Sequence, residues 1–173
     1  MELRLTINGE KQSLLISPRD ILLDVLRREG HFGVKRGCNS GDCGTCGVLI
    51  NGLPVNSCLV FAAQCEGVEV TTIEGIGTPD HPHPLQVAFN ETGAVQCGFC
   101  TPGMVVSSYA LLRRSKKPTD AEIREALEGN LCRCTGYVKP IEAVHLAAQR
   151  MAVKKREAAS PLRCSSSGPE LSK

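Results

Sequence analysis

The start of the chain shows the alternation of apolar and polar positions that is typical of half-buried strands. Leu3, Leu5 and Ile7 alternate with polar residues and are followed by Asn8-Gly9, a turn signal for a hairpin. Residues 12–16 can supply the return strand. We therefore predict that the chain begins with a β-hairpin.

The apolar spacing then changes to that of a helix. Apolar residues recur at helical spacing over positions 21–26, after Ser17 and Pro18. Ser17 is expected to be the N-cap and Pro18 the first helical residue, and Gly30 is a natural stop. One amphipathic helix is predicted to follow the hairpin.

Strand patterns return after a loop rich in Gly and Cys, which runs from Gly33 to Cys46. Residues 48–50, the Asn51-Gly52 turn signal and the segment from Val55 onward, where Cys58 is expected on the returning strand, predict a second hairpin. The segment 68–72 alternates again. This order of elements predicts a mixed sheet curled round one helix.

The composition changes at residues 75–84, which hold three prolines and two glycines. Such a segment is incompatible with a continuing helix or a central strand, so we place a domain boundary there, with domains at 1–76 and 77–156. Helices are expected over 84–92, 102–115, 121–128 and 140–156. Thr119 and Glu122 form a capping box for the third helix. The predicted fold class is therefore α+β.

Residues 157–173 contain five serines, two prolines and little apolar material, and this composition predicts disorder. The basic residues 154–156, just before this tail, are interpreted as a solvated face that complements the helix dipole. The tail is therefore left outside the two predicted domains.

Composition and charge exclude several classes of protein. The chain has 173 residues, of which 42% are hydrophobic and 22% charged, so it can fill real cores and fits neither wholesale disorder nor a fibrous repeat. A net charge of +2 and an aromatic content of 3% argue against nucleic-acid binding. No apolar run reaches the roughly 18 residues of a bilayer span, and no basic region precedes an apolar core at the N-terminus. We expect a cytoplasmic protein with no membrane span.

Cysteine is the residue type in excess, with ten copies in the chain. In a reducing compartment, closely spaced cysteines favour metal binding or redox chemistry over disulfides. The first group is Cys38, Cys43, Cys46 and Cys58, and the C-x4-C-x2-C spacing of its first three members is that of a plant-type [2Fe-2S] loop. Glycines between these cysteines allow a close wrap in which backbone N–H groups point at the sulfurs. A structural zinc site on four thiolates is the alternative.

The second group consists of two pairs in the helical half, Cys97 with Cys100 and Cys132 with Cys134. Each pair precedes a predicted helix, so two helix N-termini can direct partial positive charge at one anionic metal site. The first pair alone also resembles a thioredoxin-type dithiol, but it lacks a βαβ context and that interpretation leaves the second pair unexplained. Neither pair is followed by His, which excludes covalent haem attachment. Spacing alone leaves both a cluster and zinc open.

The remaining reactive residues form no recognisable site. Cys65 is interpreted as a small buried hydrophobe and Cys164, in the tail, as a bystander. The histidines show no ligand pattern, the acidic residues form no acid/base pair, and there is no phosphate-binding loop. The chain is therefore expected to have no catalytic site of its own.

The motifs around the two cysteine groups resemble those of one family. They run from Gly37 to Cys46, Thr72 to Gly75, Gln96 to Gly103 and Gly129 to Tyr137. Together they are similar to the iron–sulfur subunits of molybdenum hydroxylases, the xanthine dehydrogenase, aldehyde oxidase and aerobic carbon monoxide dehydrogenase enzymes. The resemblance covers residues 1–150. It implies an N-terminal β-grasp domain of the plant-type ferredoxin kind and an all-α four-helix domain, each with a [2Fe-2S] cluster.

The resemblance also implies ligands and partners. The first cysteine group would hold one cluster and the second group the other, with Gln96 and Cys134 next to the molybdopterin of a large catalytic subunit. A medium subunit would carry FAD, in a dimer of heterotrimers, and electrons would pass from molybdenum through the second-domain cluster and the first-domain cluster to FAD.

The large subunit decides the substrate, and a purine or N-heterocycle is favoured on its frequency in the family. The alternatives are the same role in an aldehyde or carbon monoxide dehydrogenase, or a free-standing two-cluster ferredoxin. Free carriers are often strongly acidic, for steered and transient docking. The net charge of +2 favours permanent packing in a complex.

Overall fold

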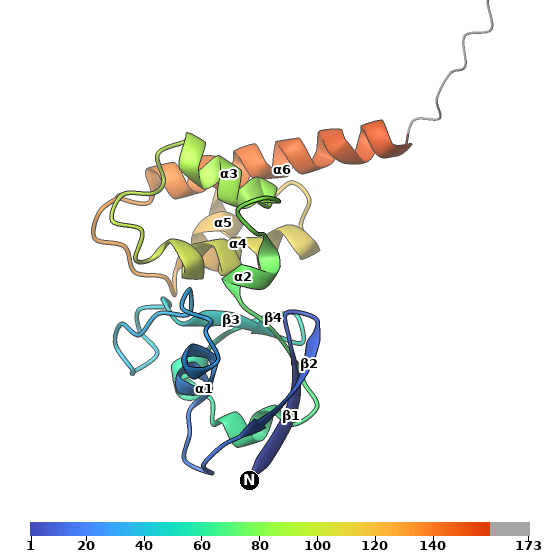
Figure 1. Cartoon of the computed structure of the whole chain (residues 1–173). Coiled ribbons are helices and arrows are strands. Elements are labelled where there is room, and N and C mark those ends of the chain that lie inside the picture. Colours follow the sequence, from blue (N-terminus) through green and yellow to red (C-terminus); the bar gives the residue numbers. More distant parts are fainter. Residues whose placement is uncertain (160–173) are drawn as a thin grey trace, which may run out of the picture.

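The computed structural model shows two halves of different construction, one after the other along the chain (Figure 1). It describes residues 1–159, with side chains described as far as Val153. A five-stranded sheet and one helix make up the first half, and longer helices make up the second. The predicted α+β class, with a helical second domain, is confirmed.

The first half is a mixed sheet with the strand order β2-β1-β5-β3-β4. Its strands are β1 (Glu2–Ile7), β2 (Glu10–Leu15), β3 (Gly47–Ile50), β4 (Leu53–Asn56) and β5 (Glu69–Thr71). β1 runs parallel to β5, and the other neighbouring strands are antiparallel. Both predicted hairpins are confirmed, with Ile7 opposite Glu10 across one turn and Ile50 opposite Leu53 across the other.

The sheet buries its apolar face against α1 (Leu22–Arg28), which lies in the curve of the sheet in Figure 1. Leu3, Leu5 and Ile7 of β1 are all buried, as their alternation predicts. The helix adds four buried residues, Leu22, Leu23, Val25 and Leu26. The predicted arrangement of a sheet curled round one helix is therefore confirmed.

The predicted start of this helix is wrong, because α1 begins at Leu22 and has no side-chain cap. Ser17 and Asp20 instead close a turn, in which the Asp20 N–H donates to the Ser17 carbonyl at 3.0 Å. Ile21 is extended and pairs with Phe61 in an isolated antiparallel bridge. The backbone enters the helix only after this contact, so a tertiary pairing overrides the local Ser-Pro signal.

The predicted break at residues 75–84 also begins too early. A short helical turn, α2 (Ile73–Ile76), includes Gly75 before the proline-rich segment. The side chain of Asn8, in the first hairpin turn, accepts a hydrogen bond from the Thr72 N–H at 2.8 Å and donates to the Thr72 hydroxyl at 3.0 Å. These bonds hold Thr72 extended just before α2, and the helical turn starts from this anchored residue.

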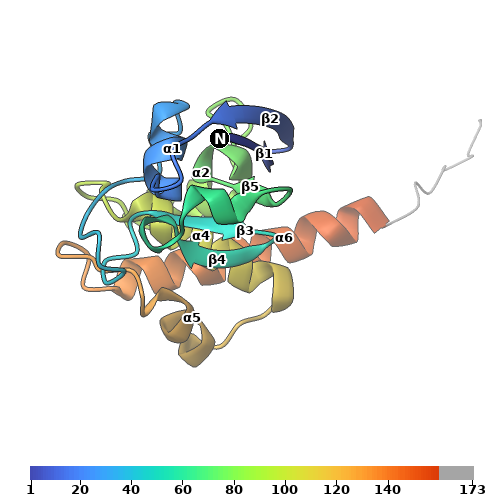
Figure 2. The ribbon, with the colours of Figure 1, turned by 90° about the horizontal axis from the view of Figure 1, so that it is seen from below.

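Four longer helices form the second half and confirm the four predicted ones. They are α3 (Pro84–Glu91), α4 (Thr101–Arg114), α5 (Asp120–Leu127) and α6 (Val138–Ala159). The expected capping box is present at the start of α5, where the Glu122 N–H donates to the Thr119 hydroxyl at 3.3 Å. Figure 2 shows α6 running across the molecule behind the sheet half, and α6 packs along α3.

The helices share a core of large apolar side chains. It includes Leu85, Phe89, Met104, Leu111, Leu112, Ile123 and Val144. None of the described helices is both long and apolar enough to cross a membrane. α6 continues past its predicted end at residue 156, while the side chains of 154–156 and the whole of 160–173, with Cys164, lie outside the described part of the chain.

Candidate metal centres

The loop between α1 and β3 carries three cysteines of the first group, Cys38, Cys43 and Cys46. Cys58 lies in a 3-10 turn, η1 (Ser57–Leu59), directly after β4, so the prediction that it lies on the returning strand is wrong. The Ser57 N–H and hydroxyl both donate to the Cys46 carbonyl, at 3.3 and 2.8 Å. These bonds hold Ser57 against Cys46, and the side chain of the next residue, Cys58, contacts that of Cys46.

Hydrogen bonds link the four cysteines of the first group as two pairs. The N–H groups of Ser40 and Cys43 each donate to the Cys38 sulfur at 3.4 Å. Hydrogen bonds from Ser40 and then from Cys43 lower the pKa of Cys38 to about 6. Burial, followed by the neighbouring Cys46 thiol, raises the pKa of Cys58 to about 11. Cys38 with Cys43 is therefore one pair, and Cys46 with Cys58 is the other.

The second group of cysteines lies where α4 and α6 begin. Cys97 and Cys100 directly precede α4, and Cys132 and Cys134 lie in the loop before α6. The Cys97 and Cys134 sulfurs are 3.7 Å apart, although the two residues are distant in sequence. The loops that carry both cysteine groups lie on the same side of the molecule, at the left of Figure 1.

The four sulfurs of the second group also form two pairs. Burial, followed by a hydrogen bond with Cys132, raises the pKa of Cys100 to about 12. Burial acts to raise the pKa of Cys132 as well, but hydrogen bonds from Thr135 and Cys134 lower it to about 7. Its sulfur accepts from the Thr135 hydroxyl at 3.2 Å and from the N–H groups of Thr135 and Cys134 at 3.4 Å. Cys97 pairs with Cys134, and Cys100 pairs with Cys132.

Two protein-family models match the chain, and each covers one of the cysteine groups. A 2Fe-2S iron-sulfur cluster binding domain matches residues 5–70. A [2Fe-2S] binding domain matches residues 72–145. Both halves of the chain are therefore similar to domains that bind this cluster.

Known proteins are similar to the chain over most of its length. The nicotinate dehydrogenase small FeS subunit of Eubacterium barkeri is 47% identical over 151 residues, which are 87% of this chain and 96% of the relative. The aldehyde oxidoreductase iron-sulfur-binding subunit of Escherichia coli strain K12 is 42% identical over 164 residues, which cover 86% of this chain and 72% of the relative. The chain belongs to the iron–sulfur subunits of the molybdenum hydroxylases.

Solved structures agree with this assignment. In quinoline 2-oxidoreductase from Pseudomonas putida 86, a chain that is 40% identical superimposes with a TM-score of 0.84 over 88% of this chain and 96% of that one. As an iron–sulfur subunit of a molybdenum hydroxylase, the chain is a non-catalytic electron-transfer component of an oxidoreductase, and it carries [2Fe-2S] clusters.

The residues of the subunit fit such clusters. A [2Fe-2S] cluster takes four thiolates, two on each iron, and each group supplies two pairs of sulfurs. A Cβ on Gly37 would lie 2.6 Å from the Cys43 sulfur, so only glycine lets the backbone wrap this closely. None of the nine cysteines in the described part of the chain is in a disulfide.

The two cysteine loops of the subunit touch each other. The Leu131 N–H, directly before Cys132, donates to the Cys43 carbonyl at 3.0 Å. The Lys35 ammonium donates to the carbonyl of Gly98, which lies between Cys97 and Cys100, also at 3.0 Å. The two candidate centres are therefore joined by polar contacts of their own loops.

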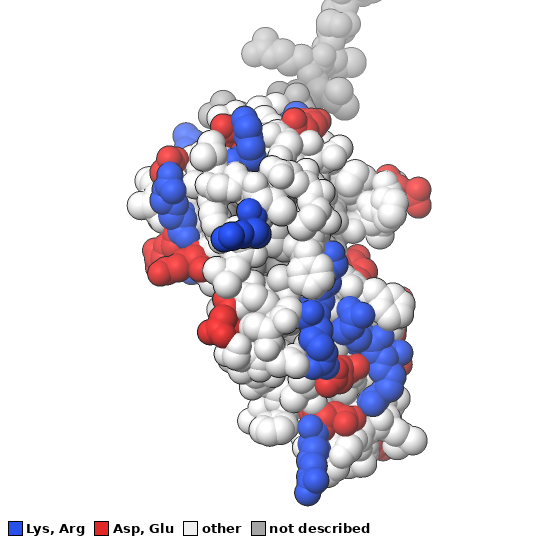
Figure 3. All heavy atoms as spheres, turned by 90° about the vertical axis from the view of Figure 1, so that its left-hand side faces the viewer, with Lys and Arg blue, Asp and Glu red and all other residues white. Residues whose placement is uncertain are grey.

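Apolar side chains are exposed next to the second group. Phe99, Leu131 and Val138 are 46%, 55% and 60% exposed, and Gln96, which the family resemblance places near the pterin, is exposed as well. Figure 3 shows the side of the molecule on which the cysteine loops lie. Uncharged residues take up most of this surface, and acidic and basic residues are interspersed rather than gathered into a patch of one sign.

Thr135 and Tyr137, which have no predicted role, make hydrogen bonds in the second cysteine loop. The Thr135 hydroxyl bonds to the Cys132 sulfur, and the Tyr137 hydroxyl accepts from the Cys132 N–H and donates to the Asn130 carbonyl, both at 2.9 Å. A signal for Thr135 was available, because Thr follows the second cysteine of each pair in this half. Nothing in the sequence indicates that the Tyr137 ring turns back over the loop.

The other residues considered from the sequence have structural roles. Cys65 is 1% exposed and burial raises its pKa, which confirms its interpretation as a buried hydrophobe. The His145 ring lies 2.6 Å from the Asp120 carboxylate, and the His83 ring accepts from the Leu85 N–H at the start of α3.

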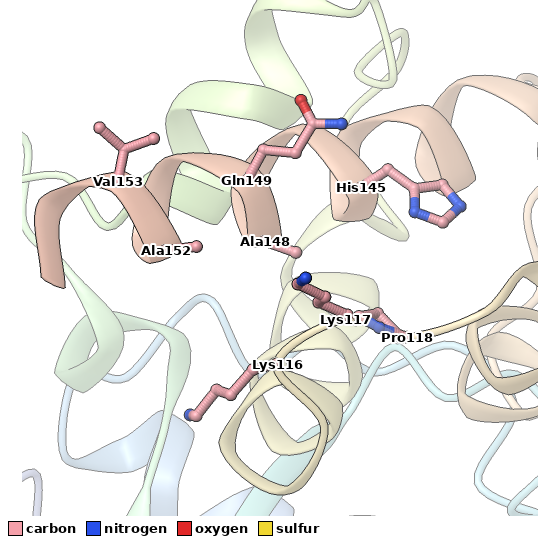
Figure 4. Close-up of a pocket in the computed structure, with 8 residues that line it drawn as sticks. All are labelled: Lys116, Lys117, Pro118, His145, Ala148, Gln149, Ala152 and Val153. Atoms are coloured by element: carbon pink, nitrogen blue, oxygen red, sulfur yellow. The ribbon is translucent and has the colours of Figure 1, made fainter. Parts of the chain in front are cut away.

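A hollow of about 410 Å³ lies between α6 and the connection from α4 to α5 (Figure 4). Its lining consists of Lys116, Lys117, Pro118, His145, Ala148, Gln149, Ala152 and Val153. The lining contains no cysteine, so the hollow is separate from both candidate centres.

Proposed function

We propose that each cysteine group holds one [2Fe-2S] cluster. The ligands of the first are Cys38, Cys43, Cys46 and Cys58, and those of the second are Cys97, Cys100, Cys132 and Cys134. The observation that carries the proposal is the arrangement of the sulfurs as two neighbouring pairs in each group. Two irons each require two thiolates, whereas one zinc ion requires four sulfurs around a single point.

We infer that electrons enter the chain at the second group and leave it at the first. When bound, a [2Fe-2S] cluster takes up and releases one electron at a time. Cys97 and Cys134 are exposed, as is Gln96, and we assign Gln96 and Cys134 to the contact with the molybdopterin of a large catalytic subunit. Cys38 is also exposed, and we assign the first group to the face that meets a medium subunit with FAD.

We propose that the subunit works within a dimer of heterotrimers in the cytoplasm. Exposed apolar residues beside the second group, such as Phe99 and Val138, are typical of a surface that a partner covers. The net charge of +2 fits permanent packing better than steered, transient docking. The nine described cysteines form no disulfide with one another, which fits a reducing compartment.

We propose an N-heterocycle, such as a purine, as the substrate class of the whole enzyme. Nicotinate and quinoline, which appear in the names of two similar proteins, are N-heterocycles. To test this, the purified complex is given nicotinate, a purine, quinoline or an aromatic aldehyde, and the turnover of each compound is measured. If the complex turns over only the aldehyde, the proposal of an N-heterocycle substrate is refuted, and the electron-transfer role of the subunit is unaffected.

The cluster assignment is tested with two matched variants, Cys58→Ala and Cys65→Ala. Both remove a buried thiol from the same apolar core. The wild-type chain should give two distinct [2Fe-2S] signals in electron paramagnetic resonance after reduction. We expect Cys58→Ala to lose one signal and Cys65→Ala to keep both. Retention of both signals in Cys58→Ala would refute the first ligand set.

The second ligand set has its own test. Cys132→Ala should remove the signal that Cys58→Ala retains, and the double variant should show neither. A colourless wild-type preparation that contains zinc and no acid-labile sulfide would refute the cluster assignment altogether. Loss of the same signal in both single variants would show that Cys58 and Cys132 serve the same centre and would refute the division into these two ligand sets.

A further inference from the structure

One hydrogen bond connects the two proposed ligand sets more directly than any other contact between the loops. The acceptor is the carbonyl of Cys43, itself a proposed ligand, and the donor is the N–H of Leu131, the residue before Cys132. From one sulfur to the other, the connection consists of the backbone and Cβ atoms of these residues and a single N–H to O contact of 3.0 Å. No side chain of another residue intervenes.

The other polar contact between the loops is less suited to this role. The Lys35 ammonium reaches the Gly98 carbonyl at 3.0 Å and lies 5.2 Å from the centre of the Phe99 ring. Neither Lys35 nor Gly98 is a proposed ligand. The contact also depends on a long side chain with several rotatable bonds, whereas Cys43 and Leu131 meet through backbone atoms.

Tyr137 holds the Leu131 amide in place from both sides. Its hydroxyl donates to the carbonyl of Asn130 and accepts from the N–H of Cys132, both at 2.9 Å. These are the residues immediately before and after Leu131. The backbone of Tyr137 has a φ of 66°, which is unusual for a bulky residue, and the turn lets its ring fold back over the loop.

Asn130 attaches this assembly to α4. Its side-chain amide donates to the Ser107 hydroxyl at 2.9 Å, and its own N–H donates to the Leu127 carbonyl at 2.9 Å. Asn130 is also 5% exposed. The loop that presents the Leu131 N–H is thus attached to α4 and α5, and the Tyr137 hydroxyl bridges the residues on either side of Leu131.

We propose that electrons cross between the two centres through the hydrogen bond from Leu131 to Cys43, and that Tyr137 is the residue that positions it. The proposal rests on the proposed function. In each crossing one centre is oxidised by one electron and the other is reduced by one, and no bond forms or breaks and no proton moves. Because electron tunnelling decays less steeply through bonded atoms than across a gap, lengthening this contact slows the crossing.

The test compares Tyr137→Phe with Tyr109→Phe in the full chain with both clusters. These are the two tyrosines of the protein, and each change removes one hydroxyl from the helical half. Tyr109 lies in α4 and contacts the His83 ring edge-on. Three quantities are measured: the reduction potentials, the rate of transfer between centres after flash photoreduction, and hydrogen exchange of the peptide that contains Leu131.

We expect Tyr137→Phe to speed exchange of the Leu131 amide about tenfold, the value of one to two hydrogen bonds. Transfer between the centres should slow severalfold at unchanged potentials, and Tyr109→Phe should change neither quantity. Faster exchange with an unchanged transfer rate would overturn the proposal, as would equal slowing in both variants.

A second variant guards against loss of a cluster in Tyr137→Phe. Replacement of Leu131 by its α-hydroxy analogue exchanges the donating N–H for an ester oxygen, and it should also slow transfer severalfold; an unchanged rate would overturn the proposed path. The proposed function fails separately, because a wild-type chain without two [2Fe-2S] signals would refute it before any variant is compared.

Discussion

Gly44 and Gly103 meet with no side chain between them where the two cysteine loops join. A Cβ on Gly103 would lie 2.3 Å from the Gly44 carbonyl oxygen, and a Cβ on Gly44 would lie 2.2 Å from the Gly129 carbonyl oxygen. Gly103 must lack a side chain for this approach to Gly44, and Gly44 must lack one for its approach to Gly129. The same approach brings Cys43, the neighbour of Gly44, within hydrogen-bonding distance of Leu131.

We expect Gly103→Ala to destabilise the protein by about 1–3 kcal/mol, the usual cost of overpacking a filled space. The obstacle is a backbone carbonyl, which cannot rotate away as the end of a side chain can. Gly103 lies inside α4, where Ala would otherwise gain about 1 kcal/mol in helix propensity, so a net loss is diagnostic of the clash. Urea unfolding measures the change.

The control for this prediction is Gly129→Ala in the same half. A Cβ at Gly129 would meet nothing within 4 Å. That variant should therefore keep the wild-type stability or gain a few tenths of a kcal/mol from reduced freedom of the unfolded chain. Equal destabilisation by both substitutions would contradict a specific clash at Gly103.

Elements with a local signal could be predicted from the sequence. Asn8-Gly9 places the first hairpin turn, and the reciprocal bonds of Thr119 and Glu122 start α5 where the capping box predicts. These elements are predictable because the residues that form the sequence motif are the same residues that form the turn or the cap in the structure. The spacing of the cysteines likewise indicated which of them belong together.

Features that depend on distant residues could not be predicted in this way. α1 starts late because Ile21 pairs with Phe61, and Cys58 lies in a 3-10 turn where the Ser57 hydroxyl bonds to the Cys46 carbonyl. The bonds of Tyr137 to the loop before it require a positive φ that its residue type does not indicate. In each case a tertiary contact decides the local backbone conformation, whereas the local sequence is compatible with more than one conformation.

Stability of the helical half should fall in acid because of Glu122. The Thr119 N–H, and then the Thr119 hydroxyl, donate to this carboxylate and lower its pKa below the ordinary 4.5. A carboxyl whose folded pKa lies below its unfolded pKa stabilises the fold fully above the unfolded value, and this contribution disappears as the pH falls through the folded value. We therefore expect the loss below about pH 4.5.

Glu122→Gln provides the comparison, because Gln keeps the shape of the capping box but does not titrate. The melting temperature should be measured from about pH 6 to about pH 3, and the variant should show a shallower decline than the wild type at the acid end. Parallel declines of the two proteins over this range would exclude Glu122 as a source of the pH dependence.

The Thr135 hydroxyl should raise the reduction potential of the second centre. It lies 3.2 Å from the Cys132 sulfur, and a donor to a ligand sulfur stabilises the more negative, reduced state more than the oxidised one. If the bond contributes about 1 kcal/mol to this difference, its loss in Thr135→Val lowers the potential by about 40 mV, since a tenfold change in a one-electron equilibrium is about 59 mV. Potentiometric titration followed by electron paramagnetic resonance measures the shift.

Two further variants separate this effect from a general loss of packing. Thr135→Ser keeps the hydroxyl and should restore the wild-type potential. Thr92→Val removes a hydroxyl that bonds to the Ala88 carbonyl at the end of α3, and it should leave the potential unchanged. Because the N–H groups of Thr135 and Cys134 still donate to the Cys132 sulfur in Thr135→Val, the cluster should stay bound while its potential falls. An unchanged potential in Thr135→Val would contradict the prediction and would show that the Thr135 hydroxyl does not affect the reduction potential of this centre.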